Sequence, residues 1–328
     1  MSNKLMINDL YPWLEGYWLQ WQTSLNNQQF PAASLLISPS GLGAERLIEK
    51  LSAAVMCSHS HSEACGFCHS CELMKSGSHP DFHLISPEKE GKAITVDQIR
   101  QCNKLAQESA QLSGARFIVI NPADSMNESA ANALLKTLEA PGRNCFFLLV
   151  ASRINPLLPT IISRCQKTVL TPPSSEQVSH WLSEQTSQPV PPYAAHLNGY
   201  SPLNTLAFIQ SGELTKYQAF EQNIAHCLTD ASADISACVK QINEAPTQYL
   251  AWLWTMLTDT QKVQFGVVEQ QQLPISLRLA KQISYPVLYR QTKALTRLME
   301  ELKTFSGLNS ELLISDWLFN FNDEKTCL

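Results

Sequence analysis

The chain has 328 residues, a length that predicts two or three domains. Hydrophobic residues make up 44% of it, which is enough to form a hydrophobic core in each domain. Its formal net charge is -5 and its pI about 5.9. This balance argues against a protein that holds duplex DNA on its own basic surface, because phosphate neutralisation needs clustered lysine and arginine. The N-terminal segment carries Lys4, Asp9 and Glu15, so it is not expected to be a signal peptide, and no apolar stretch is long enough to span a membrane. A cytoplasmic protein is the expectation.

Ten cysteines could suggest a disulfide scaffold, but such scaffolds are typical of short secreted chains without a large core. Four of the cysteines lie within residues 57–71. The others are scattered: Cys102, Cys145, Cys165, Cys227, Cys238 and Cys327. Scattered thiols fit a reducing compartment, and the cluster fits a metal.

Up to about residue 168, short apolar runs alternate with helical stretches. Strands are expected at residues 34–37, 81–85, 117–120, 146–150 and 167–170. Thr95 and Gln98 can form a capping box for a helix running to about Gln111, and Asn127 can cap a second helix through Leu138. Strands alternating with helices predict an α/β fold with a parallel sheet covered on both faces.

Residues 38–45 follow the first expected strand and precede a helix, where a phosphate-binding loop belongs. Ser38, Gly41 and Gly43 keep the skeleton of such a loop. A working loop needs a lysine for the β- and γ-phosphates and a serine or threonine for Mg²⁺. Here Ala44 and Glu45 occupy those two positions, and the charge of Glu45 would repel a phosphate. The loop is predicted to be degenerate, and taken alone it is equally well a glycine-rich turn that never bound nucleotide.

The clustered cysteines have the spacing C-x₇-C-x₂-C-x₂-C: Cys57, Cys65, Cys68 and Cys71. Ligands three residues apart on a tight turn can converge on one tetrahedral ion, and four thiolates suit Zn²⁺. Such a zinc would be structural, because four protein ligands leave no open position for water. An iron–sulfur cluster and free thiols are the alternatives. The nearby histidines, His69, His79 and His83, are expected to be ordinary surface or strand residues.

The expected strand 117–120 ends where the acidic, metal-binding pair of an ATPase should stand. Asn121 and Pro122 follow it instead, and neither can ligate Mg²⁺ or activate water. Asp124 lies slightly downstream and is expected to be a solvated or capping residue. Two separate parts of the ATP site, the phosphate-binding loop and the acidic metal-binding pair, are therefore predicted to lack their functional residues.

The composition changes after residue 170. Residues 171–175 are a predicted linker, followed by short helical pieces interrupted by prolines and Gly199. From about Gly212 only helices are expected, with apolar residues at helical spacing around these positions: Trp252, Trp254, Leu257, Leu312, Leu313, Trp317 and Leu318. The predicted domains are 1–168 (α/β), 169–211 (a small helical lid) and 212–328 (all-α).

Three blocks in the first domain resemble the clamp-loader subunits of bacterial DNA polymerase III, members of the AAA+ family. Residues 127–141 resemble the helix after the acidic motif, residues 147–152 the sensor strand, and residues 160–165 contain the Ser-Arg-Cys motif. The spacing between these three blocks also matches the family. The resemblance implies an AAA+ P-loop-type sheet domain with a zinc module, a helical lid and an all-α collar.

Within this family the chain resembles the delta-prime subunits, which lack the ATP site that the gamma and tau motor subunits keep. Residues 11–14 resemble their N-terminal signature, residues 199–202 the start of their third lid helix, and residues 311–313 their last collar helix. Leu203 stands where ATP-using relatives carry a sensor arginine. The resemblance therefore implies that no ATP is bound.

The resemblance also implies roles for individual residues. Arg164 would project into the ATP site of a neighbouring motor subunit, where a guanidinium stabilises transition-state charge. Ser163 and Cys165 would position its loop, and Cys165 has no histidine or asparagine partner to make it a nucleophile. The first gap of the cysteine cluster is one residue shorter than the family pattern. This leaves His59 or His61 as a possible substitute for Cys57 as the fourth zinc ligand.

The implied function is that of a non-catalytic stator in a clamp loader, within a DNA-directed DNA polymerase holoenzyme (a nucleotidyltransferase). The implied partners are the gamma or tau and delta subunits, and, through the complex, the sliding clamp and primer-template DNA. Two alternatives stay open: a gamma-type motor ATPase, and a zinc-containing nucleic-acid-binding protein unrelated to ATPases.

Overall fold

The computed structural model describes residues 10–60, 62–89, 91–112, 114–230, 233–267, 271–305 and 307–326. The chain folds into two compact units, Met1–Pro173 and Ser174–Leu328. Within the described ranges, none of the helices combines the length and the apolarity that crossing a bilayer requires. The boundary between the units lies close to the predicted end of the α/β domain. The further division into lid and collar remains a prediction, because both lie in the second unit.

The first unit is built on five parallel strands in the order β2-β3-β4-β1-β5. Its strands are β1 (Ala33–Ile37), β2 (Phe82–Ile85), β3 (Arg116–Ile120), β4 (Cys145–Ala151) and β5 (Gln166–Val169). Its helices are η1 (Pro12–Leu14), α1 (Glu15–Asn26), α2 (Ala44–Met56), α3 (His69–Ser76), α4 (Val96–Gln107), η2 (Ala123–Ser125), α5 (Glu128–Glu139) and α6 (Pro159–Ile162). The predicted α/β class and all five predicted strands are confirmed, with ends that differ by one residue or so.

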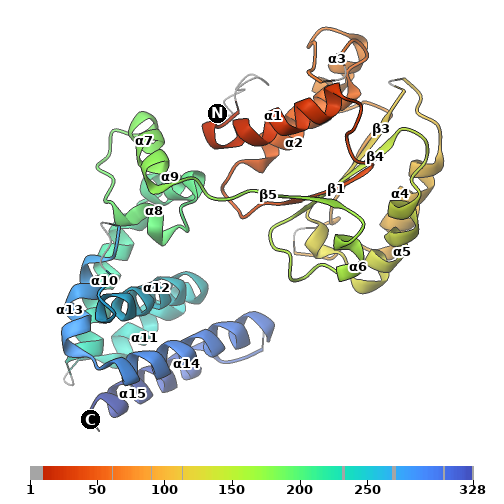
Figure 1. Ribbon diagram of the computed structural model, residues 1–328. Coiled ribbons are helices and arrows are strands. Elements are labelled where there is room, and N and C mark those ends of the chain that lie inside the picture. Colours follow the sequence, from red (N-terminus) through yellow and green to blue (C-terminus); the bar gives the residue numbers. More distant parts are fainter. Residues whose placement is uncertain are drawn as a thin grey trace. The chain divides into compact units, whose positions relative to one another are not determined.

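Helices cover both faces of this sheet because successive strand residues point to opposite sides. In β1, Leu35 packs into the core under α4 and α5, whereas Leu36 packs into the core under α1 and α2. The central strands β1, β3 and β4 are buried almost throughout. Figure 1 shows α1 and α2 on one side of the sheet and α4 and α5 on the other.

Helix α4 begins as predicted and ends earlier than predicted. Thr95 and Gln98 form the capping box, but the helix stops at Gln107, four residues before the expected end. Beyond it, the backbone N–H groups of Gln111 and Leu112 donate to the carboxylate of Asp81, at 2.7 and 2.8 Å. These bonds fix the chain in a turn, so the helix cannot continue.

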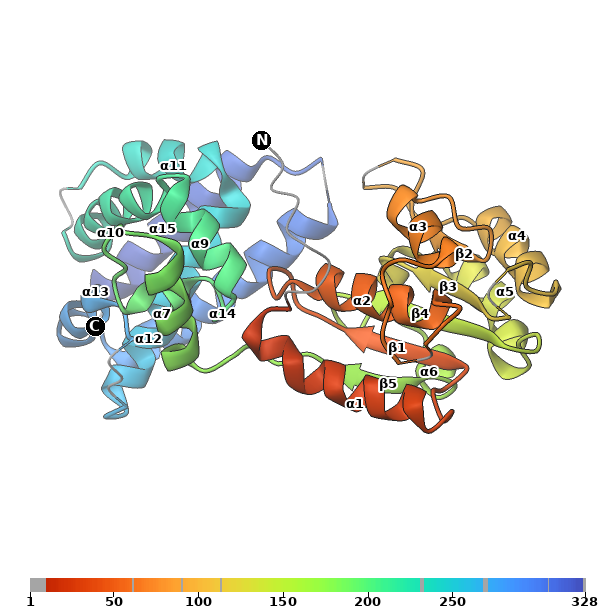
Figure 2. The same ribbon diagram turned by 90° about the horizontal axis from the view of Figure 1, so that it is seen from above.

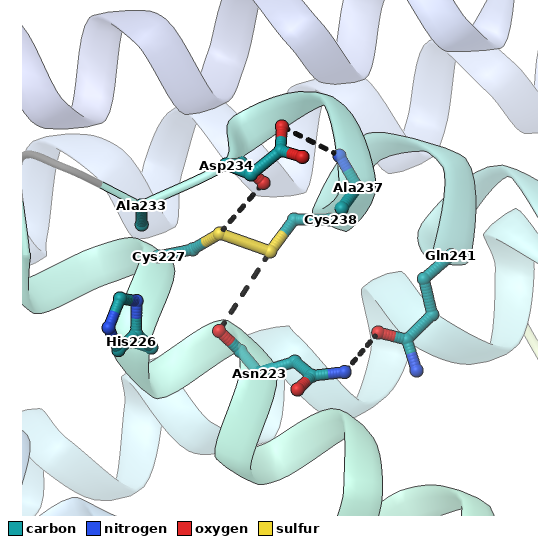
Figure 3. A pocket seen from close by; sticks show the side chains of 8 residues that line it. All are labelled: Asn223, His226, Cys227, Ala233, Asp234, Ala237, Cys238 and Gln241. Carbon is teal, nitrogen blue, oxygen red and sulfur yellow. Dashed lines mark hydrogen bonds between the residues drawn. A yellow bond between two sulfur atoms is a disulfide. The ribbon is translucent and has the colours of Figure 1, made fainter.

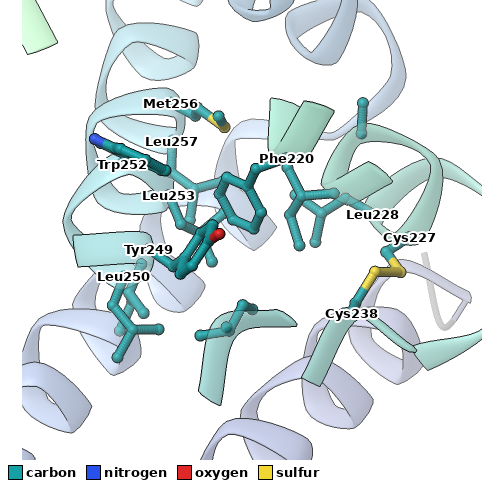
Figure 4. Close-up of a cluster of buried hydrophobic side chains, with 14 of the residues drawn as sticks. Phe220, Cys227, Leu228, Cys238, Tyr249, Leu250, Trp252, Leu253, Met256 and Leu257 are labelled. Atoms are coloured by element: carbon teal, nitrogen blue, oxygen red, sulfur yellow. A yellow bond between two sulfur atoms is a disulfide. The ribbon is translucent and has the colours of Figure 1, made fainter. Parts of the chain in front are cut away.

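The second unit consists of helices only, as far as the structure describes it. They are α7 (Ser175–Gln185), α8 (Tyr193–Leu197), α9 (Pro202–Gln210), α10 (Glu213–Thr229), α11 (Ile235–Glu244), α12 (Pro246–Gln264), α13 (Pro274–Gln282), α14 (Tyr285–Thr304) and α15 (Ser310–Thr326). Ser174 caps α7 through a capping box with Gln177, so this residue starts a helix instead of belonging to the predicted linker. The aromatic rings of Phe220, Tyr249 and Trp252 meet in the core (Figure 4).

The predicted apolar stripes of this unit are confirmed in part. Trp252, Leu257, Trp317 and Leu318 are buried. Two positions in the same stripes are not: Trp254 is 39% exposed and Leu312 is 65% exposed. Trp254 lies next to the buried Leu253, and Leu312 next to the half-buried Leu313, but the helix turns both toward the outside, since neighbouring residues on a helix point about 100° apart.

Candidate functional site

The loop at residues 38–43 joins β1 to α2, as the sequence predicts. Gly41 and Gly43 both have positive φ, 76° and 73°, a conformation that glycine adopts without strain. Gly43 is the N-cap of α2, so the helix N-terminus faces the loop as in a phosphate-binding site. Ala44 is buried and offers only a methyl group, whereas Glu45 is exposed and brings a negative charge to the first turn.

The N-terminal segment holds this loop from the side. The indole Nε1 of Trp13 donates to the carbonyl oxygen of Leu42 at 2.8 Å, and Leu42 is fully buried. Tyr11 stacks on Trp13 with ring centroids 4.9 Å apart, and the guanidinium of Arg46 lies 4.1 Å from the centre of the Tyr11 ring. These contacts fix the loop to the rest of the unit, and the residues 11–14 noted in the sequence make most of them.

The end of β3 carries Asn121 and Pro122, joined by a cis peptide bond. Asp124 follows in η2, and its carboxylate accepts hydrogen bonds from the hydroxyl and the backbone N–H of Ser152, at 2.5 and 3.2 Å. Ser152 lies directly after β4. Asp124 stays partly exposed, as expected, but it is not an isolated residue. It connects the carboxyl ends of two neighbouring strands, a pairing that local sequence does not reveal.

Arg164 lies just after α6, on the surface of the first unit. Its guanidinium donates to the carboxylate of Glu139 through Nε at 2.6 Å and also through Nη2, and its Nη1 donates to the carbonyl of Thr160 at 2.9 Å. Both charged side chains are partly exposed, 32% for Arg164 and 51% for Glu139. Exposed ion pairs of this kind contribute about 0–1 kcal/mol, so a competing anion can replace Glu139 at little cost.

The residues flanking Arg164 contribute to its loop. The hydroxyl of Ser163 donates to the carbonyl of Thr160 at 3.1 Å, the same oxygen that accepts from Arg164. Cys165 is half-buried against the core under α5 and α6, and burial raises the pKa of its thiol to about 11. A thiol that is protonated at neutral pH is a poor nucleophile, in keeping with the expected positioning role.

The four clustered cysteines converge between α2 and α3. Cys57 is the C-cap of α2, Cys68 is the N-cap of α3 and Cys71 lies in its first turn. All four sulfur atoms lie within 4.8 Å of one another. The Sγ atoms of Cys57 and Cys68 are 4.0 Å apart, and those of Cys65 and Cys71 are 3.9 Å apart. In Figure 2, α3 and the edge strand β2 lie at the same end of this unit.

These distances fit a bound metal ion. Four sulfurs at about 2.3 Å from a central Zn²⁺ would be about 3.8 Å apart in a tetrahedron. Backbone N–H groups of Cys65 and Cys71 donate to the sulfurs of Cys57 and Cys68, both at 3.4 Å, as expected around thiolates. The cluster can therefore hold one tetrahedral cation, with Cys57 among its ligands.

The electrostatics of the cluster also favour a cation. Burial opposes ionisation of these thiols, and it raises the pKa of Cys71 to about 12. For Cys68 the opposing hydrogen bonds from Ser58 and His59 prevail and lower the pKa to about 4. Without a positive charge, neighbouring thiolates repel one another, so full ionisation of the set needs a bound cation.

His59 lies beside the cluster, with Nδ1 3.9 Å from the sulfur of Cys65. His61, the other substitute ligand considered, is outside the described residues. His69 is exposed. His79 is buried, and its Nε2 lies 2.6 Å from the hydroxyl of Ser70, a hydrogen bond that fixes the helix α3 that carries Cys71.

One pair of the scattered cysteines is not free. Cys227 in α10 and Cys238 in α11 form a disulfide, with Cα atoms 7.1 Å apart. Figure 3 shows the bond in the wall of a pocket of about 210 Å³, beside Asn223, Asp234 and Gln241. The expectation that all cysteines outside the cluster are isolated thiols is wrong here, because the two helices bring together residues 11 positions apart.

Comparison with known proteins agrees with these features. The family model "DNA polymerase III, delta subunit" matches residues 14–174, and a second family model, which describes the C-terminal part of such subunits, matches residues 211–323. A protein of Haemophilus influenzae named DNA polymerase III subunit delta' is 32% identical over 94% of this chain and 96% of its own length. The protein of the same name from Escherichia coli is 31% identical over 94% of each chain.

The chain therefore belongs to the family of DNA polymerase III delta-prime subunits. The family resemblance drawn from residues 127–165 is confirmed. Among solved structures, a gamma subunit-related protein from Thermotoga maritima matches with a TM-score of 0.42 and 17% identity, covering 93% of this chain and 99% of its own. A clamp loader delta protein from Bacillus subtilis matches with a TM-score of 0.34 and 13% identity, covering 93% and 99%.

Proposed function

We propose that this chain is a non-ATP-binding stator of the DNA polymerase III clamp loader that supplies Arg164 in trans to a motor subunit. The observation that carries the proposal is the combination of a nucleotide loop that lacks its functional residues with a partly exposed guanidinium just after α6. In the described part of the chain, that guanidinium is held by Glu139 and the carbonyl of Thr160. Full-length relatives named delta' support the clamp-loader role.

The loop supports the absence of ATP on chemical grounds. A nucleoside triphosphate needs a lysine beside its β- and γ-phosphates and a serine or threonine hydroxyl that holds Mg²⁺. Ala44 supplies neither, and Glu45 in the first turn of α2 would repel a phosphate. Asn121 and Pro122 leave the metal without its acidic ligands. Leu203 at the sensor position fits the same loss.

The metal in the cysteine cluster is proposed to be a structural Zn²⁺ held by Cys57, Cys65, Cys68 and Cys71. When bound, the ion supplies a crosslink between α2 and α3. Four thiolate ligands suit Zn²⁺ and leave no position for a reacting water. An iron–sulfur cluster can also take four cysteines and is distinguished by its visible absorption.

The proposed partners are the gamma or tau motor subunits and the delta subunit. The sliding clamp and primer-template DNA would be engaged through the complex, in the cytoplasm. The second unit, with its predicted lid (169–211) and collar (212–328), would join the ring through the collar. The motor-ATPase alternative would require a functional residue at Ala44 or Glu45, which this sequence lacks. The alternative of an unrelated zinc protein conflicts with the family.

The test is ATP hydrolysis by a clamp loader reconstituted from this chain with its cognate motor and delta subunits, stimulated by clamp and primed DNA. We expect Arg164→Ala to lower the rate by about tenfold or more, since fingers supplied in trans accelerate hydrolysis by about 10³–10⁵. Arg143→Ala, an exposed arginine on the same unit, is the matched control and should leave the rate unchanged.

A second variant tests the ion pair between Arg164 and Glu139. Glu139→Gln removes the carboxylate that holds Arg164 and keeps the side-chain size, so hydrolysis should be retained or increased. A normal rate with Arg164→Ala would reduce Arg164 to a surface residue and limit the chain to scaffolding. Tight ATP binding by the isolated chain would contradict the blank nucleotide site.

A further inference from the structure

Four large aromatic side chains are exposed along the line where α12 meets α14 in the second unit. Their exposed fractions are 39% for Trp254, 67% for Phe265, 39% for Tyr285 and 52% for Tyr289. We call this set the aromatic seam. Elsewhere in the same unit, Tyr217, Phe220 and Trp252 are buried, and Phe305 and Phe319 are exposed outside the seam. Contacts between neighbouring rings distinguish the seam.

Hydrogen bonds fix the two helices side by side along the seam. The indole Nε1 of Trp254 donates to the hydroxyl of Thr296 at 3.0 Å, and the amide of Gln261 donates to the hydroxyl of Thr292 at 2.6 Å. These pairs show that the helices run antiparallel. The seam is therefore presented by two ordered helices, α12 and α14, and not by a loose loop.

Three of the rings form a continuous group at one end of the seam. Phe265 meets Tyr285 edge to face with centroids 4.9 Å apart, and the Tyr285 ring lies 6.1 Å from that of Tyr289. Trp254 lies eleven residues before Phe265, the C-cap of α12, which is about 16 Å along the helix axis. Apolar ring faces are thus spread over the length of several stacked bases.

Positive charge continues the exposed surface of α14. Tyr285, Tyr289, Lys293 and Arg297 follow one another at four-residue intervals, so each is a surface neighbour of the next, in a row that winds by about 40° per step, and all four are exposed. In the described part of the chain, neither Lys293 nor Arg297 forms an ion pair. Glu300 and Glu301 follow them and limit the positive stretch at that end.

The surrounding sequence is unusually basic for this protein. Residues 261–299 contain six lysines and arginines and one acidic residue, in a chain whose net charge is -5. The nearest carboxylate on α12, Asp259, is 1% exposed and is bonded to His196 and Lys262, so it adds little negative potential to the surface. The local charge is therefore complementary to a polyanion.

We propose that the aromatic seam, together with Lys293 and Arg297, binds single-stranded nucleic acid without sequence preference. Exposed aromatic rings accept unpaired bases by stacking, and cations along the same track contact the phosphates. A duplex hides its base faces, so it would use only the cations. This site is built from other residues than Arg164 and the nucleotide loop, and it does not depend on the proposed function.

The test is fluorescence anisotropy of a labelled oligothymidylate titrated with the full-length chain at several salt concentrations. We expect the wild type to bind the single strand more tightly than a duplex of the same length. The pair Lys293→Glu and Arg297→Glu should weaken binding by at least about tenfold and reduce the slope of log affinity against log salt by about 1.4. The pair Phe265→Ala and Tyr289→Ala should weaken binding without changing that slope.

Matched controls keep the outcome interpretable. Lys104→Glu with Arg143→Glu makes the same charge change on exposed positions of the first unit, and Phe319→Ala removes a 54% exposed ring from α15. Both should bind normally, and circular dichroism should show that every variant is folded. Equal affinity for duplex, or equal losses in the controls, would overturn the proposal. So would seam variants that bind the oligonucleotide normally but fail to assemble with partner subunits, an outcome that would identify a protein interface.

Discussion

The side chain of Asp259 shows how one buried carboxylate can hold two helical segments together. It is 1% exposed, and its oxygens lie 2.9 and 3.0 Å from Nε2 of His196. Lys262 and the backbone N–H of Leu273 donate to it as well, at 3.2 and 3.3 Å. Burial alone would raise the pKa of Asp259, but the His196 contact and the other donors outweigh burial and lower it.

This lowered pKa makes the second unit sensitive to acid. A carboxyl group with a lower pKa in the folded state contributes stability that is present above its unfolded pKa, about 3.9, and is lost as pH falls through the folded value. We expect Asp259→Asn to reduce the free energy of unfolding by about 3 kcal/mol at pH 7, because buried donors lose their anion. The difference from the wild type should shrink below about pH 4.

Urea unfolding followed by circular dichroism at pH 7 and at pH 3 measures both values. Asp97→Asn, which removes an exposed partner of Arg100, is the control and should change stability by less than about 0.5 kcal/mol. If Asp259→Asn has the same effect at both pH values, the carboxylate is not the source of the pH dependence.

At the scale of elements, the segment between α2 and α3 depends on its cysteines. From Cys57 to Cys68 the chain has no helix or strand in its described part, and its buried apolar contacts are few: the cysteines themselves with Ala64. Such a segment cannot fold on hydrophobic burial alone, so ligand bonds to a metal are expected to supply the missing free energy. The sheet of the same unit has its own large cores.

We expect Cys65→Ser to abolish stoichiometric zinc binding and to expose residues 57–76 to proteases, while the sheet stays folded. Atomic emission of the purified protein and limited proteolysis provide the two measurements. Cys165→Ser changes a half-buried thiol outside the cluster and should retain one zinc per chain. Full retention of zinc by Cys65→Ser would show that another donor, such as His59, replaces the cysteine.

At the scale of the whole molecule, the two compact units have separate cores. The first contains two cores, one on each face of the sheet, and the second contains a core that joins α9 to the helices after it. Phe208 of α9 packs against Tyr217 and Trp252, so the predicted lid shares apolar burial with the predicted collar.

We expect residues 1–173 and 174–328, expressed separately, each to unfold cooperatively on heating, since each holds a complete core. Removal of zinc with a chelator should lower the transition temperature of the first fragment and leave the second unchanged. Differential scanning calorimetry provides the measurement. A second fragment that melts without a heat-absorption peak would show that it needs the first unit to fold.

The sequence by itself determined features that depend on neighbouring residues. Apolar runs predicted the five strands, Thr95 and Asn127 predicted helix starts, and the spacing of Cys65, Cys68 and Cys71 predicted their convergence. The missing lysine and hydroxyl at Ala44 and Glu45 can likewise be recognised from consecutive residues of the loop. Each of these patterns spans only a few consecutive residues, over which the backbone geometry of a strand, helix or turn fixes which residues meet.

Only the tertiary structure decided which distant residues meet. The partners of Arg164 and Asp124, Glu139 and Ser152, are 25 and 28 positions away, and the early end of α4 depends on Asp81, 30 positions before Gln111. The disulfide of Cys227 and the exposure of Trp254 depend likewise on how α10, α11, α12 and α14 pack. Helical periodicity predicts that a helix has an apolar face, but the packing of neighbouring helices decides how much of that face is covered.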